Sequence, residues 1–462
     1  MSKSSPLLHR LSLGLLALLP FTAAPAWAIS SWDGKAPAEY ILYADVDRPD
    51  AKYHKGDTVT FTLKLEHNNQ PASTETVDYV ITKDGYLPPP GKEPISKGTV
   101  NLVDGKATVT ATLDEPGFLL CTATFKKDKT VFTAPVAAAV DPQDIKPSMP
   151  VPDDFDAFWA EKLKQLAVVP INATLTPIPA LPDRPNAEMF EMQADCVGKP
   201  VTGYYARPVG AKPKSCPALL MVPGAGVLSC APINAARWGD KGFLTLDVNA
   251  HGIPNGKPRE FYNELAMGEL KDYRTHGRES RDTYYFLGMY LRVVRALDFL
   301  ASQPEWDGHT LFIEGVSQGG AQAIAGAALD PRVSFLLAGF PAMSDHSGMV
   351  ANRIAGWPKM VAVGPDGKPD PASLETSRYF DSVNFASRVK APTYYYIGFI
   401  DLITPPTGGY AAYNAIPGKK ELVEDPIHGH NHDNPQFWST VTKVTLDQAK
   451  AQGATPSVPV AH

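Results

Sequence analysis

A serine stands on a glycine-rich stretch, Gly-Val-Ser-Gln-Gly-Gly, over residues 315–320. The glycines around Ser317 fit the turn that exposes a nucleophilic hydroxyl between a strand and a helix, where it can attack an acyl carbonyl. Glycines suit this turn because it is sharp and strained, and because side chains there would keep the strand and the helix apart. The apolar residues 311–313 predict the strand, and residues 321–328 predict the helix. The sequence therefore predicts Ser317 as the nucleophile of an acyl-transfer reaction.

A carboxylate and a histidine are expected downstream of Ser317, because hydrolases with this turn carry their triad in the order Ser, Asp or Glu, His. Two aspartates, Asp401 and Asp345, each follow an apolar run that predicts a strand. We favour Asp401, because its strand, residues 393–398, is the more clearly apolar and the Thr-Pro-Pro sequence at 404–406 predicts a rigid loop beyond it. The other interpretation of Asp345 is an ordinary surface or helix-capping carboxylate.

Three histidines, His428, His430 and His432, follow the apolar residues 422–423. One of them is expected to be the general base of the triad. The alternative is a metal site, since histidines at this spacing on an irregular loop could converge on a cation. On a regular strand they would lie too far apart to chelate tightly, because alternate residues are separated by about 6.6 Å. Other histidines, such as His251, His276 and His346, are predicted to be surface or structural residues.

The elements that must position these residues alternate between strands and helices. This alternation predicts a mainly parallel sheet with helices on both faces, the α/β-hydrolase fold. The expected strands are 218–222, 243–248, 311–313, 335–339 and 393–398. The expected helices are 153–166, 282–302, 319–328 and 434–450, with a hairpin around 198–200.

The N-terminal part has a different pattern. Short runs such as 58–65 and 106–111 alternate between apolar and polar residues, with Asp-Gly and Pro-Gly turns between them. Period two predicts antiparallel strands, so residues 29–140 are expected to form a small all-β sandwich of the immunoglobulin-like kind. This part has no cluster of Ser, His, Asp or Cys that would carry chemistry, which favours a structural or interaction role. A proline-rich linker is predicted over 141–152, and the catalytic domain over 153–462.

Residues 1–28 are typical of a secretory signal peptide. A positively charged start precedes the apolar run 11–21, and Ala26-Trp27-Ala28 is a small-x-small cleavage site. We therefore expect export, with the mature protein periplasmic or secreted after cleavage near Ala28. No later segment offers the run of about 18 apolar residues that a membrane helix needs, so no membrane span is expected in the mature protein.

Composition limits the other possibilities. The chain has 462 residues, which is more than a single hydrophobic core usually supports. Two domains are therefore expected. The 43 basic and 49 acidic residues are mixed along the sequence, which argues against nucleic acid as a partner. Four cysteines would allow three disulfide pairings in an oxidising compartment, and the sequence does not choose among them. They are Cys121, Cys196, Cys216 and Cys230.

Four blocks in the same order resemble the acetyl xylan esterase and cephalosporin C deacetylase family of carbohydrate esterases. The blocks are 152–159, 282–297, 317–321 and 398–414. The resemblance covers the chain from about residue 152 to the C-terminus, and the sandwich and the signal peptide lie outside it. It implies small acyl groups, chiefly acetyl, on sugar hydroxyls.

The resemblance also implies roles for individual residues. The family's acid falls on Asp401, and its histidine follows a glycine, which Gly429 and His430 match. Asn431 stands where the family often has Glu, so His428 and His432 stay as alternatives. The oxyanion would be held by the backbone N–H groups of Gln318 and Ala225. Residues 223–225 are Pro-Gly-Ala, at the position where the family commonly has His-Gly-Tyr.

The expected function is thus an exported serine esterase that removes acetyl groups from carbohydrates such as acetylated xylan, with Ser317, His430 and Asp401 as the triad. No metal and no cofactor are required. The expected partner is an acetylated carbohydrate or another small ester, and a homo-oligomer is possible. One alternative is a broad small-ester hydrolase or a peptidase with the same triad. A more distant one is a non-catalytic carbohydrate-binding protein with a hydrolase body.

Overall fold

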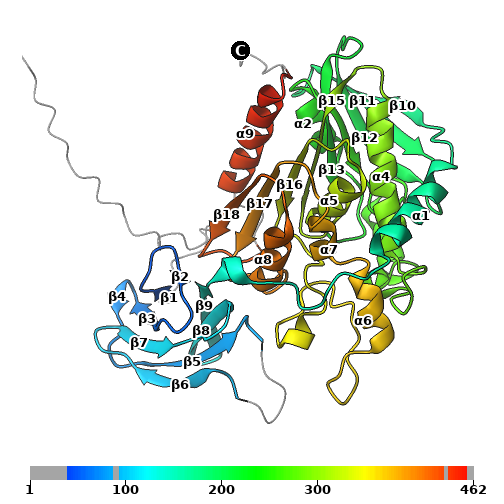
Figure 1. Ribbon diagram of the computed structural model, residues 1–462. Coiled ribbons are helices and arrows are strands. Elements are labelled where there is room, and N and C mark those ends of the chain that lie inside the picture. Colours follow the sequence, from blue (N-terminus) through cyan, green and yellow to red (C-terminus); the bar gives the residue numbers. More distant parts are fainter. Residues whose placement is uncertain (1–38, 87–92, 431–434, 455–462) are drawn as a thin grey trace, which may run out of the picture.

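The computed structural model describes residues 39–86, 93–430 and 435–454. The predicted signal peptide, residues 1–28, lies outside these ranges, and so does His432. Figure 1 shows a small all-β part at the N-terminus and a larger part in which helices flank a central sheet. In the described ranges no helix is long and apolar enough to cross a membrane.

The N-terminal part consists of two sheets that face each other across a common core. In β3 every second residue from Val59 to Leu65 is buried, as the alternating sequence predicts. One sheet contains β1 (Tyr40–Val46), β3 (Val59–His67), β4 (Gln70–Pro71) and β7 (Lys106–Ala111). The other contains β2 (Lys52–Tyr53), β9 (Thr130–Val140), β8 (Gly117–Lys127), β5 (Thr76–Lys83) and β6 (Ser96–Asn101). The predicted all-β sandwich is confirmed; its pairs are antiparallel except that β2 runs parallel to β9.

The stretch 141–152 is held against the catalytic part along its length. It begins with a short turn of 3-10 helix, η1 (Pro142–Asp144), and leads to α1 (Phe155–Ala167). Asn414 donates two hydrogen bonds of 3.0 Å to backbone carbonyls of this stretch, those of Pro142 and Ile145. Because its carbonyls are bound in this way, the stretch is a fixed connection between the two parts.

The catalytic part is built on a nine-stranded sheet with the strand order β10-β11-β12-β14-β13-β15-β16-β17-β18. Strands β10 to β12 are antiparallel, and all pairs from β14 to β18 are parallel. The antiparallel strands are β10 (Thr174–Ile178), β11 (Ala187–Ala194) and β12 (Val201–Pro208). The parallel strands are β13 (Cys216–Val222), β14 (Leu244–Val248), β15 (Trp306–Val316), β16 (Phe335–Gly339), β17 (Thr393–Gly398) and β18 (Lys420–Asp425). The predicted mainly parallel sheet is confirmed.

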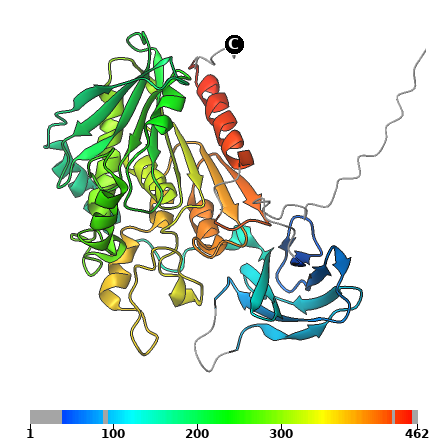
Figure 2. The same cartoon turned by 180° about the vertical axis from the view of Figure 1, so that it is seen from behind.

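Helices cover both faces of this sheet (Figure 1 and Figure 2). On one face α2 (Pro232–Gly239) and α9 (Pro435–Ala451) pack on side chains such as Leu219 and Met221 of β13. On the other face α4 (Phe286–Ser302), α5 (Gln318–Leu329) and α8 (Pro406–Ala415) share a core with Ala218 and Leu220 of the same strand. Both faces are covered, so the central strands are mostly apolar, although Asp247 of β14 and Glu314 of β15 are also buried. The remaining helices are α3 (Arg259–Met267), η2 (Tyr273–Thr275), η3 (Gly348–Ala351), α6 (Pro371–Arg378) and α7 (Ser382–Ala386).

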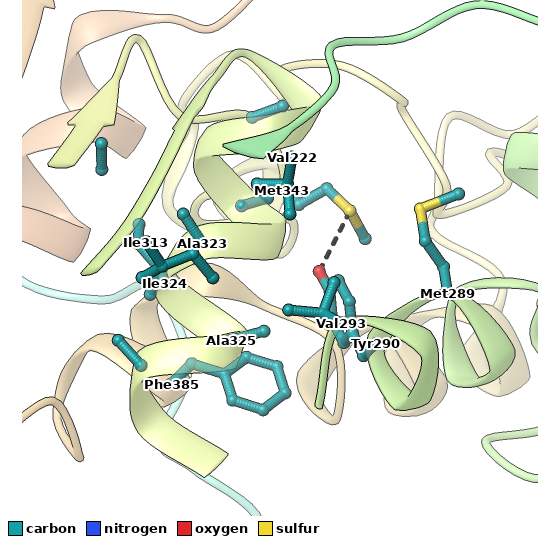
Figure 3. Close-up of a cluster of buried hydrophobic side chains, with 14 of the residues drawn as sticks. Val222, Met289, Tyr290, Val293, Ile313, Ala323, Ile324, Ala325, Met343 and Phe385 are labelled. Atoms are coloured by element: carbon teal, nitrogen blue, oxygen red, sulfur yellow. Dashed lines mark hydrogen bonds between the residues drawn. The ribbon is translucent and has the colours of Figure 1, made fainter. Parts of the chain in front are cut away.

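Small residues let α5 lie close to the sheet and to α4. A Cβ added to Gly326 would come within 2.7 Å of the Ile313 side chain and 2.8 Å of the Val293 side chain. Figure 3 shows Ala323 and Ala325 in this cluster, and the hydroxyl of Tyr290 directed at the sulfur of Met343 at 3.3 Å. The helix that follows Ser317 is therefore fixed by tight packing.

The cysteines remain unpaired. All four lie in the described residues, and none takes part in a disulfide. Cys121, Cys196 and Cys216 are buried, and Cys230 is half-buried.

Candidate active site

Ser317 lies at the turn between the end of β15 and the start of α5. Its φ of 61° is in the left-handed region, which a residue other than glycine adopts only when its surroundings require it. A Cβ on Gly315 would lie 2.2 Å from the carbonyl oxygen of Gly319, and a Cβ on Gly319 would lie 2.3 Å from that of Val222. The glycines are therefore needed for the close approach that the sequence predicts at this turn.

Three side chains form a continuous chain of hydrogen bonds. His430 Nε2 lies 2.9 Å from Ser317 Oγ, and His430 Nδ1 lies 2.7 Å from Asp401 Oδ2. Since the carboxylate can only accept, Nδ1 carries the proton and Nε2 is left to accept from the serine hydroxyl. This is the arrangement in which a histidine can take a proton from a serine that attacks a carbonyl.

Asp401 is held in place by its own loop, residues 399–407, which we name the Asp401 loop. Its carboxylate is 1% exposed. Oδ1 accepts hydrogen bonds of 2.8 Å from the backbone N–H groups of Ile403 and Thr404, and Oδ2 accepts one of 2.7 Å from the Thr404 hydroxyl. These donors stabilise the ionised carboxylate in a buried position and fix the oxygen that faces His430.

Asp345, the alternative candidate for the acid, makes other contacts. Asp345 accepts hydrogen bonds from the backbone N–H and the hydroxyl of Ser148, at 2.8 and 2.7 Å, and pairs with Arg353 at 3.2 Å. It binds the stretch 141–152 to the catalytic part and does not contact His430 in the structure.

Of the alternative histidines, His428 is hydrogen-bonded to a carboxylate other than Asp401. Its Nδ1 lies 2.8 Å from Asp425 Oδ2, at the end of β18. His432 lies outside the described residues. In the described part of the chain, no group of three or more His, Cys, Asp or Glu side chains is arranged to hold a metal ion.

The two predicted oxyanion donors lie on segments that contact each other. Gln318 is the first residue of α5, where backbone N–H groups and the helix dipole favour a negative charge. Ala225 lies on residues 223–226, which we name the 223–226 loop. Gln322 of α5 donates a 2.9 Å hydrogen bond to the Pro223 carbonyl and so ties this loop to the Ser317 turn.

A buried polar network behind these donors was not predicted from the sequence. His251 is 1% exposed; its Nε2 lies 3.0 Å from the Gly226 carbonyl, and its Nδ1 lies 2.8 Å from the Tyr285 hydroxyl. Tyr273, whose ring packs edge-on against His251, donates a 2.6 Å hydrogen bond to the Gln318 side chain. One network thus reaches both predicted donor segments.

Burial lowers the pKa of His251 to about 4, so the ring is neutral at working pH. Its Nε2–H then donates to the Gly226 carbonyl, and Nδ1 accepts from Tyr285. His251 was predicted to be a surface or structural histidine, and these contacts agree with a structural role, but only the fold reveals that its partner is the 223–226 loop. His276 is exposed, and His346 is buried with its pKa lowered to about 3 by burial.

The model of the acetyl xylan esterase family AXE1 matches residues 141–445, which is well over half of the chain. The chain belongs to the acetyl xylan esterase family. The esterase is also 31% identical over 398 residues to the acetyl esterase Axe7A of Xylanibacter ruminicola, with 85% of this chain and 87% of that protein covered. The resemblance drawn from the four sequence blocks is confirmed, and the chain is a carboxylic ester hydrolase.

Solved structures give the same result for the fold. An acetyl xylan esterase from Paenibacillus sp. R4 is 28% identical, with a TM-score of 0.58, and covers 66% of this chain and 98% of its own. Acetyl xylan esterase 1 from Thermoanaerobacterium sp. JW/SL YS485 is 21% identical, with a TM-score of 0.52, and covers 66% and 97%. The predicted α/β-hydrolase fold of the esterase is confirmed.

Proposed function

We propose that this esterase is exported and removes acetyl groups from carbohydrates such as acetylated xylan or xylo-oligosaccharides by a Ser-His-Asp acyl-enzyme mechanism. The observation that carries the proposal is the hydrogen-bonded series Ser317–His430–Asp401, with distances of 2.9 and 2.7 Å. Membership of the acetyl xylan esterase family supports the ester class.

In this mechanism the Ser317 hydroxyl attacks the acetyl carbonyl while His430 Nε2 takes its proton. Asp401 stabilises the imidazolium that forms and keeps its ring in the required orientation. The negative charge on the carbonyl oxygen is held by the backbone N–H groups of Gln318 and Ala225, each worth about 3–4 kcal/mol in the transition state. The sugar hydroxyl leaves with the proton from His430, and water then repeats the cycle on the acetyl-enzyme.

The names of the relatives favour acetyl as the acyl group. One is an acetyl esterase and two are acetyl xylan esterases. The alternative is a broad small-ester hydrolase or a peptidase, because the same triad serves those reactions. Rates on acetyl, butyryl and peptide substrates would separate these possibilities.

Export rests on residues 1–28 alone. The prediction is a mature protein in the periplasm or outside the cell that begins near Ile29, and N-terminal sequencing of the protein from that fraction tests it. A homo-oligomer stays a prediction, which sedimentation of the purified protein would test.

The decisive experiment uses the purified mature protein and its Ser317→Ala variant. We expect acetate release from acetylated xylo-oligosaccharides by the wild type and none by the variant. A fluorophosphonate probe should label the wild type only, which would exclude a non-catalytic carbohydrate-binding protein. Labelling without acetate release would leave the nucleophile in place and refute the carbohydrate substrate.

A further inference from the structure

The sandwich and the catalytic part share a hydrophobic core. Phe118 of β8 is 1% exposed and belongs to the same buried cluster as the central sheet. Its ring lies 5.2 Å from that of Phe399 and 5.7 Å from that of Tyr410. These two aromatic residues stand at the start of the Asp401 loop and just beyond its end. Figure 1 shows the sandwich beneath α8 and β18, next to this loop.

A buried carboxylate of the sandwich binds the end of the Asp401 loop. Asp84 is 3% exposed, and its Oδ1 accepts hydrogen bonds from the Phe118 N–H at 3.0 Å and from the Thr407 hydroxyl. Next to it, a Cβ added to Gly85 would lie 2.5 Å from the Leu402 side chain, so Leu402 packs on the backbone of the turn at residues 84–85, directly after β5. The sandwich therefore contacts the residue after Asp401 and the first turn of α8.

A second contact of the sandwich reaches β18, the strand that leads into the loop carrying His430, residues 426–430, which we name the His430 loop. Lys52 of β2 pairs with Glu424 of β18 at 2.5 Å, and Tyr410 donates a hydrogen bond to the same carboxylate. The next residue, Asp425, ends β18 and accepts a 2.9 Å backbone hydrogen bond from Phe399. One ion pair thus joins the sandwich to the strand that leads into the His430 loop.

We propose that the N-terminal sandwich is a positioning domain, which holds the Asp401 loop and the His430 loop at the spacing that the hydrogen bond between Asp401 and His430 requires. Resting on the proposed function, this gives the sandwich a role in catalysis without any contact with the substrate. Asp84 and Lys52 are its positioning residues, since they act through Thr407 and Glu424.

The position of its contacts distinguishes the sandwich from a domain that is merely appended to the catalytic part. Asp84, Gly85 and Phe118 meet residues 399–410, and Lys52 meets β18 next to the His430 loop. The Paenibacillus enzyme covers 66% of this chain with 98% of its own, so a relative completes this fold without a comparable N-terminal part. In this protein the Asp401 loop and the strand before the His430 loop contact surfaces that such a relative does not have.

The test compares Asp84→Ala with the conservative variant Asp84→Asn in the full mature protein. Burial raises the pKa of Asp84 to about 6, so a neutral amide of the same shape is a reasonable replacement that still accepts both hydrogen bonds. With 4-nitrophenyl acetate at 25 °C we expect kcat of Asp84→Ala to fall about tenfold or more with KM little changed, since small displacements of catalytic groups are costly. Asp84→Asn should restore most of the loss.

The rate of covalent labelling of Ser317 by a fluorophosphonate should fall in the same proportion as kcat. The matched control is Leu63→Ala, which damages the sandwich core away from the loops; Leu63 is fully buried in β3. It should lower the melting temperature and leave kcat near the wild-type value. Thr407→Val removes the hydrogen bond between Thr407 and Asp84 by changing the residue in the catalytic part. This variant replaces Asp84→Ala in the test if Asp84→Ala does not fold.

The outcomes separate this proposal from the proposed function. Wild-type labelling and acetate release report on the proposed function, and their absence would overturn both. If the wild type is active and folded Asp84→Ala or Thr407→Val keeps its kcat, the positioning role is refuted. The same holds if Leu63→Ala loses kcat as strongly as Asp84→Ala, because the effect would then follow stability alone.

Discussion

The hydroxyl of Thr404 donates a 2.7 Å hydrogen bond to Asp401 Oδ2, the oxygen that also faces His430. The same hydroxyl lies 3.2 Å from His430 Nδ1. Thr404 therefore stands beside the contact between the proposed acid and the proposed base. Without its donor, Asp401 Oδ2 would lose one of the two groups that fix its direction.

We expect Thr404→Val to lower kcat about tenfold, the effect of losing a hydrogen bond to a charged group that contributes about 1.5 kcal/mol. KM should change little, because Thr404 acts on Asp401 and not on the substrate. Steady-state kinetics with 4-nitrophenyl acetate measures both quantities. Thr404→Ser keeps the hydroxyl and is the control; equal loss in both variants would point to packing instead.

The choice among the histidines can be tested by replacing them one at a time. His430→Ala should lower kcat by more than about 1000-fold, because no other base lies within hydrogen-bond distance of Ser317 Oγ in the described residues. His428→Asn should stay close to the wild-type rate, since the His428 ring is paired with Asp425. His432→Asn completes the series. A large loss in His428→Asn together with an active His430→Ala would reverse the assignment.

The network behind the proposed oxyanion donors offers a second test. Tyr273→Phe removes the hydrogen bond to the Gln318 side chain and should lower kcat about tenfold, less than the 10²–10³ lost when a donor itself is removed. The affinity for a boronic acid inhibitor should fall in parallel, because its adduct places an oxygen at the oxyanion position. Unchanged boronate affinity with a lower kcat would place the effect elsewhere.

Much of the site could be predicted because its parts are local in sequence. The glycines around Ser317, the apolar strand before Asp401 and the histidine after Gly429 are each readable within a few residues. The network of His251, Tyr273 and Tyr285 could not be read, because its members meet only when three loops fold against one another. The contact of Asp84 with Thr407 joins residues more than three hundred positions apart, and no spacing rule covers it.

The elements show the same division. Strands β16 and β17 have the predicted bounds, 335–339 and 393–398, because both are short continuous apolar runs. The helix predicted over 282–302 begins later, at Phe286, since residues 277–284 form hydrogen-bonded turns before it. The Thr-Pro-Pro sequence at 404–406 predicts a rigid loop, yet Pro406 is the first residue of α8. Proline suits that position because its missing N–H would have no partner there.

The last prediction concerns Glu314, which lies on β15 three residues before Ser317. Its side chain is 6% exposed, and the Arg237 guanidinium is 3.7 Å away. Burial raises the pKa of Glu314 to about 7, from an ordinary value of 4.5. Asp247 of β14 lies at the same level of the sheet as Glu314, and Met221 of β13 lies between the two residues. Burial raises the pKa of Asp247 to about 6.

Between about pH 4.5 and 7 the folded protein keeps a proton on Glu314 that the unfolded chain releases, so the free energy of unfolding falls as the pH rises through this window. Glu314→Gln removes this pH-dependent fall in the free energy of unfolding. Relative to the wild type, the variant should gain up to about 3 kcal/mol on going from pH 4.5 to pH 8. A smaller slope should persist from Asp247. Melting temperatures at pH 4.5, 6 and 8 measure the effect, and a difference between the variant and the wild type that is the same at all three pH values would show that folding does not raise the pKa of Glu314.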